Sequence, residues 1–102
     1  MATIAIYYQM KVNQKIEEVI AFINDFIRQL ETDNVIKGVF IDQYAERSEF
    51  YELLHSSSNK IDIIFLEKPL EDEFDEKLLL EIAKIENIQI KYFSELPRTP
   101  VE

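Results

Sequence analysis

Four charged residues stand close to the ends of apolar segments in this chain of 102 residues, and they are Lys11, Asp42, Lys68 and Glu95. A lysine beside a carboxylate can act as a general acid or base when burial shifts its pKa. These four residues are therefore the candidate set for chemistry in a crevice. The competing interpretation is that they are ordinary surface charges, which is the more common fate of Lys and Glu.

A regular alternation of predicted strands and helices places these residues. Short apolar runs predict strands at residues 3–8, 35–41, 60–66 and 88–93, and apolar residues at helical spacing predict helices at 14–31, 49–55 and 71–86. Right-handed crossovers favour the strand order 2-1-3-4. The predicted fold is an α/β domain of three layers, with a four-stranded parallel sheet flanked by three helices. Functional groups in such sheets gather at the carboxyl ends of the strands.

The first helix carries the strongest periodic signal. Its apolar residues form one stripe that we expect to be buried against the sheet: Ile16, Val19, Ile20, Ile23, Phe26, Ile27 and Leu30. Asn13 is the expected N-cap of this helix. The lone glycine, Gly38, falls within the second predicted strand.

The other two helices are shorter or less regular. Ser48 is the expected cap of the second helix, whose predicted buried side is Phe50, Leu53 and Leu54. The third helix opens on acidic residues, which suit the positive end of the helix dipole. Its expected buried residues are Phe74, Leu78, Leu79, Ile82 and Ile85. Residues 56–59 are a predicted turn, residues 1–95 a predicted single domain, and residues 96–102, with two prolines, a predicted unstructured tail.

The charge balance and the composition exclude several classes of site. The chain has 20 acidic and 11 basic residues and a net charge of −9, whereas nucleic-acid binders usually neutralise phosphates with excess Lys and Arg. Direct nucleic-acid binding by this chain alone is therefore disfavoured. It has no cysteine and one histidine, His55, so we expect no metal site and no cofactor. No apolar run reaches the roughly 18 residues of a membrane helix, and a cytoplasmic protein without membrane contact is expected.

Two familiar α/β sites do not fit. A phospho-receiver needs an acidic pair after the first strand, where this chain has Tyr8 and Gln9, and an Asp at the end of the third strand, where it has Leu66 and Glu67. A dinucleotide-binding turn needs three closely spaced glycines, and the chain has only one.

Five passages in order resemble the N-terminal catalytic domain of the serine recombinases, the resolvases and invertases. They are residues 6–12 (IYYQMKV), 39–42 (VFID), 47–54 (RSEFYELL), 60–68 (KIDIIFLEK) and 88–93 (IQIKYF). The first is similar to the family's opening strand, Tyr-x-Arg-Val-Ser, and the third to its Arg-Pro-x-Phe-x-x-Leu-Leu passage. The resemblance covers residues 3 to about 95 and implies a resolvase-like fold.

The family's functional residues carry over poorly. The nucleophilic serine falls on Lys11 and the preceding arginine on Gln9. The family's Asp-Arg-Leu-x-Arg passage falls on residues 70–74, so that Glu71 and Phe74 occupy its arginine positions. Only Asp42 and Arg47 persist. Because phosphoryl transfer depends on cations aimed at phosphate oxygens, we expect no catalytic residue here.

Three functions remain open at this stage. The first is a catalytically inactive resolvase-like domain that serves as a protein-interaction or regulatory module and modulates a recombinase, with a protein partner or a homodimer. The second is a small-molecule enzyme or ligand-binding site at the crevice of Lys11, Asp42, Lys68 and Glu95. The third is an accessory DNA recombination protein, which would need a partner to supply positive charge.

Overall fold

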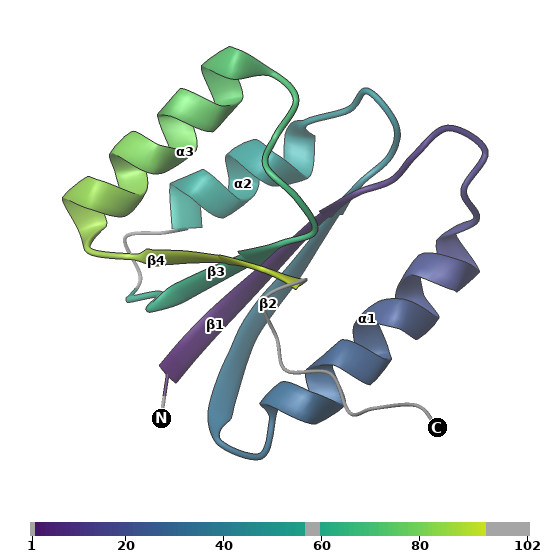
Figure 1. Cartoon of the computed structure of the whole chain (residues 1–102), viewed down its shortest axis with the longest axis horizontal. Helices are drawn as coiled ribbons and strands as arrows, with labels where there is room; N and C mark the ends of the chain where they lie inside the picture. The colour runs from purple at the N-terminus through teal and green to yellow at the C-terminus, as the bar shows by residue number, and fades with distance from the viewer. Residues whose placement is uncertain (1, 57–59, 94–102) are drawn as a thin grey trace.

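A parallel sheet lies between two layers of helices in the computed structural model, which describes residues 2–56 and 60–93 of the chain (Figure 1). The strands are β1 (Ala2–Gln9), β2 (Asn34–Asp42), β3 (Ile63–Leu66) and β4 (Gln89–Tyr92). Every pairing is parallel and the order is β2-β1-β3-β4, which confirms the predicted fold class. In this register Gln9 lies beside Asp42, and Leu66 lies between Tyr7 and Tyr92.

The helices are α1 (Ile16–Leu30), α2 (Ser48–Ser56) and α3 (Glu73–Glu86). Figure 1 shows α1 on one face of the sheet and α2 with α3 on the other. Strand β1 is central and buried on both faces, so its alternate side chains enter two separate cores. One core joins Ile4, Ile6, Tyr8 and Met10 to α1, and the other joins Ala5 and Tyr7 to α2 and α3.

Helix α1 buries four of the seven residues expected to be inside: Val19, Ile23, Phe26 and Leu30. Ile27 is partly buried, but Ile16 and Ile20 are 42% and 45% exposed, so the prediction is wrong for these two. The reason is that a stripe of seven residues is wider than the line along which a helix touches a sheet. The Ile16 side of the stripe therefore remains in solvent.

The predicted cap at Asn13 is also wrong. Asn13 has φ = 64° and lies in the turn before α1, and Lys15 is the N-cap residue without a side-chain hydrogen bond. Gln14 organises this turn instead. Its Oε1 accepts from the Lys11 amide at 2.9 Å, and its Nε2 donates to the Tyr8 hydroxyl at 2.9 Å.

Helix α2 is capped from a neighbouring strand. The Asp42 carboxylate accepts from the amides of Glu49 at 2.8 Å and Phe50 at 3.0 Å, whereas the sequence predicts Ser48 for this role. Phe50 and Leu53 are buried and Leu54 is partly buried, as expected. The end of β2 and the start of α2 are thereby fixed to each other.

Helix α3 is rotated relative to the prediction. Asp75, Leu79 and Ala83 face inward, while Phe74 and Ile85 are 68% and 73% exposed. Hydrogen bonds at its first turn fix this rotation, because Asp72 accepts from the Asp75 amide and Glu76 accepts from the Leu70 amide. Burial of Phe74 and Ile85 would turn Asp75 away from the contacts described below.

Some expectations fall outside the described residues, namely most of the turn at 56–59, Glu95 and the tail at 96–102. Among the described helices, none is long and apolar enough to span a membrane.

Candidate functional site

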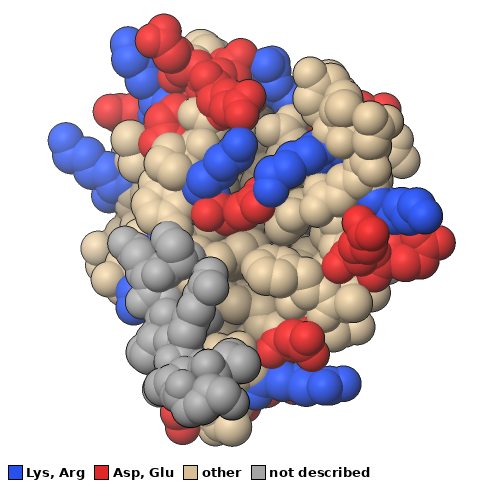
Figure 2. Space-filling view, turned by 45° about the vertical axis from the view of Figure 1, so that its right-hand side comes forward, with Lys and Arg blue, Asp and Glu red and all other residues tan. Residues whose placement is uncertain are grey.

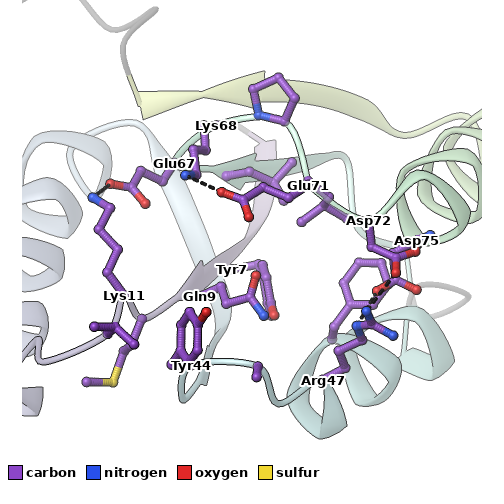
Figure 3. A pocket seen from close by; sticks show the side chains of 17 residues that line it. Tyr7, Gln9, Lys11, Tyr44, Arg47, Glu67, Lys68, Glu71, Asp72 and Asp75 are labelled. Carbon is purple, nitrogen blue, oxygen red and sulfur yellow. Dashed lines mark hydrogen bonds and ion pairs between the residues drawn. The ribbon is translucent and has the colours of Figure 1, made fainter.

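A pocket of about 280 Å³ opens at the carboxyl ends of the strands (Figure 3). It lies between the loops that follow β1, β2 and β3, which is where parallel α/β sheets usually place their sites. The sequence-predicted residues that line it are Gln9, Lys11, Arg47, Lys68 and Glu71. We call it the carboxyl-end pocket.

Other predicted residues lie elsewhere. Asp42 is 1% exposed and sits beneath Tyr7, which lines the pocket. Phe74 is on the outer surface of α3 and does not line the pocket, so it is wrong as a site residue. Glu95 is outside the described residues.

Lys11 is paired at one end of the pocket. Its Nζ lies 2.7 Å from Glu67 Oε2, and both side chains retain contact with solvent. The hydrogen bond and the negative charge of Glu67 raise the pKa of Lys11. Lys11 therefore stays protonated near neutral pH, which is the opposite of what a general base requires.

Lys68 is paired with a neighbour in the same loop. Its Nζ lies 3.0 Å from Glu71 Oε2, three residues further along the chain. Both side chains are at least half exposed, so solvent weakens this pair. Glu71, a residue of the sequence-predicted site, therefore pairs with a lysine of its own loop.

Arg47 is held by two carboxylates at the opposite end of the pocket (Figure 3). Its Nη2 lies 2.7 Å from Asp72 Oδ2, and its Nε lies 2.9 Å from Asp75 Oδ2. Asp75 is buried, with a side chain 5% exposed, and it also accepts from the Tyr51 hydroxyl at 3.0 Å. Arg47, which directly precedes α2, and Tyr51, which lies in α2, are thereby joined to α3.

These contacts shift the ionisation of the groups in a consistent direction. The negative charge of Asp75 raises the pKa of Arg47, and its hydrogen bond raises the pKa of Tyr51. The pKa of Asp72 is lowered, first by the hydrogen bond from the Asp75 amide and then by the charge of Arg47. Arg47 and Asp72 are therefore stabilised in their charged forms, and Tyr51 is stabilised in its neutral, protonated form.

Asp42 has a structural set of partners. Besides its two amide donors in α2, it accepts from the Tyr7 hydroxyl at 2.7 Å. Burial, followed by the hydrogen bond to Asp42, raises the pKa of Tyr7. Three donors occupy this carboxylate, so it supports the floor of the pocket without facing a ligand.

Among the described residues that line the pocket, three cations are matched by four carboxylates, Glu67, Glu71, Asp72 and Asp75. Figure 2 likewise shows positive and negative side chains interspersed along the upper part of the molecule, without a broad positive patch. An anion entering the pocket would meet cations whose charge is already balanced by carboxylates, and the four carboxylates would repel it. Within the described part of the chain no group of three or more His, Cys, Asp or Glu residues could hold a metal ion.

Sequence reasoning missed the partners of these cations, namely Glu67, Asp72 and Asp75, and the tyrosines Tyr7 and Tyr44 that line the pocket. One signal was available. Asp72 and Asp75 are three residues apart at a helix start, which is the spacing of an N-cap acid and its third helical residue. The partnership of Arg47 with them is long-range and leaves no local pattern.

No family model, curated protein or solved structure matches this chain in the three comparisons.

Proposed function

We propose that the chain is a catalytically inactive resolvase-like domain that serves as a protein-interaction or regulatory module. The support is twofold: five ordered sequence passages resemble the serine recombinases, and the α/β fold with strand order 2-1-3-4 is compatible with a resolvase-like domain. A module of this kind can regulate an active recombinase by binding to it. Its partner is a protein or a second copy of the chain.

One observation carries the proposal: Arg47, the arginine that persists from the family pattern, is bound by both Asp72 and Asp75. Phosphoryl transfer needs cations that are aimed at phosphate oxygens. Two of the guanidinium nitrogens are already committed to carboxylates, and Lys11 at the position of the nucleophile is committed to Glu67. The arrangement favours a structural role for these residues over catalysis.

The test is a titration of the full chain with inorganic phosphate and with a short DNA duplex, followed by NMR of backbone amides and the Arg47 Nε–H. We expect no saturable shifts at the pocket for the native chain. The variant Asp72→Asn keeps a side chain that can cap α3 but removes one negative charge from Arg47, so phosphate binding should strengthen. Saturable binding of phosphate or DNA to the native pocket would overturn the proposal.

A small-molecule site is the second candidate, because a pocket of about 280 Å³ lined by Tyr7, Tyr44 and Gln9 is present. Gln9 already donates from Nε2 to the Glu46 carbonyl oxygen at 3.1 Å. An enzymatic role would need Lys11 with a lowered pKa. NMR titration of the Lys11 ammonium group separates the two candidates, since a pKa below the ordinary lysine value would favour the enzyme.

A further inference from the structure

Helix α3 presents an apolar stripe that the described part of the chain covers only in part. The stripe consists of Phe74, Leu78, Ile82 and Ile85, at spacings of four, four and three residues, so that all four lie along one side of the helix. Phe74 and Ile85 are 68% and 73% exposed, and the two residues between them are half-buried. Figure 1 shows α3 on the same face of the sheet as α2, at the outer side of the molecule.

This stripe is unusual because helices on a sheet normally bury their main apolar side. Here the side against the sheet consists of Asp75, Leu79 and Ala83. The apolar stripe of α3 is therefore not the side that packs α3 onto the sheet of its own chain. Large exposed apolar surfaces with polar rims mark interaction sites in monomeric proteins.

A row of charges runs beside the stripe. It consists of Glu73, Lys77, Glu81 and Lys84, each one residue before a member of the stripe. All four are exposed, and none of them forms an ion pair with another described residue. The signs alternate along the helix. A copy of the row read in the reverse direction has the opposite sign at every position.

We propose that α3 packs antiparallel against α3 of a second copy of this chain, related by a two-fold axis. Phe74 then packs against the partner's Ile85, Lys77 faces the partner's Glu81, and Lys84 faces the partner's Glu73. A parallel arrangement in register would place like charges together. The antiparallel one also sets the positive end of each helix dipole beside the negative end of the other.

The net charge of the chain works against contact between two copies. At a net charge of −9, two copies repel each other at long range, so a contact between them needs local complementarity. The edges of the sheet are less suited to such a contact. The register shift of β2 opposite Ile4 and Ala5 and its Lys37 are features that oppose strand addition, and β4 is an edge strand of only four residues. The inference rests on the interaction role in the proposed function and names its partner as a second copy of the chain. The stripe lies apart from the carboxyl-end pocket, so the contact does not depend on what the pocket binds.

The test is sedimentation velocity of the full chain over a wide range of concentration, with two charge-reversed variants. The native chain should form a dimer that dissociates on dilution. Lys77→Glu and Glu81→Lys should each weaken it about tenfold or more, because each places like charges in contact at two symmetric positions. A mixture of these two variants should dimerise, since every position of the row is then opposite in sign across the contact.

The mixture separates the proposed contact from other causes of weakened association. Both substitutions are at exposed positions, so the fold should tolerate them, and circular dichroism of each variant checks this. Ile85→Ser should also weaken the dimer, while Leu80→Ser, at an exposed position on the same helix outside the stripe, should not. A native chain that stays monomeric at all concentrations, or two variants that do not associate when mixed, would overturn the proposal. Neither result would bear on phosphate binding at the pocket.

Discussion

The two faces of the sheet are held in different ways. On the α1 face the contacts are apolar and aromatic, and Phe26 packs with ring centroids 5.1 Å from Phe65 and 4.3 Å from Phe93. The α2 and α3 face contains both of the buried carboxylates found in the described residues, Asp42 and Asp75. The first face relies on packing, and the second uses polar anchors that set the position and rotation of its helices.

This difference explains why residues that look functional can be structural. Asp42 caps α2 and receives the Tyr7 hydroxyl, and Asp75 joins α3 to Arg47 and Tyr51. All of these groups lie at or beneath the carboxyl-end pocket. Their hydrogen-bond and ion-pair partners belong to the same chain, so these groups hold α2 and α3 in position.

The largest expected effect is a difference in the free energy of unfolding between a substitution in α1 and one in α3. Phe26→Ala should lower the free energy of unfolding by about 3–5 kcal/mol, because it leaves a cavity in the aromatic core. Phe74→Ala, the matched change on the outer stripe of α3, should cost less than about 0.5 kcal/mol in dilute protein. Urea unfolding of the two variants measures both values. Similar losses would mean that α3 buries Phe74 after all.

The second effect tests the polar anchor at α2. Asp42→Ala should cost about 3 kcal/mol, which combines a lost helix cap with an unsatisfied, buried Tyr7 hydroxyl. Asp62→Ala is a suitable control, since Asp62 accepts an amide hydrogen bond from Thr3 at an exposed site. Equal effects of the two substitutions in urea unfolding would contradict the role assigned to Asp42.

The smallest effect is a dependence on alkaline pH. The pKa of Tyr7 is raised in the folded chain, so Tyr7 keeps its proton at a pH where it loses it in the unfolded chain. Below about pH 10 both states are protonated and Tyr7 adds no pH dependence. Above about pH 10 the unfolded state binds fewer protons, and the free energy of unfolding should fall as pH rises. Tyr7→Phe should make this fall shallower in unfolding experiments; an unchanged slope would count against the buried Tyr7–Asp42 pair.

The sequence predicts the fold well because alternation of strands and helices leaves few topologies, and right-handed crossovers select among them. Periodicity shows which residues share a side of a helix, but in α3 two sides were available. Local hydrogen bonds at Asp72 and Glu76, together with the contact from Asp75 to Arg47, selected the less apolar side. The contact of Asp75 with Arg47 joins distant parts of the chain, and no local pattern encodes it.

The sequence predicted where the candidate site lies but not how its charged side chains are paired. Gln9, Lys11, Arg47, Lys68 and Glu71 do meet at one pocket, because the carboxyl ends of parallel strands share an edge. Whether their charges face a ligand or each other depends on side-chain pairing. Glu67 and Asp75 decide that question, and neither was in the predicted set.

The most direct test of this account is a double-mutant cycle on the contact between Arg47 and Asp75. The free energy of unfolding is measured for Arg47→Ala, for Asp75→Ala and for the double variant. If Arg47 is a structural partner of Asp75, the double variant should lose less stability than the sum of the two single variants. Additive losses would show that Arg47 is energetically free of Asp75, and would return it to the candidates for binding a ligand.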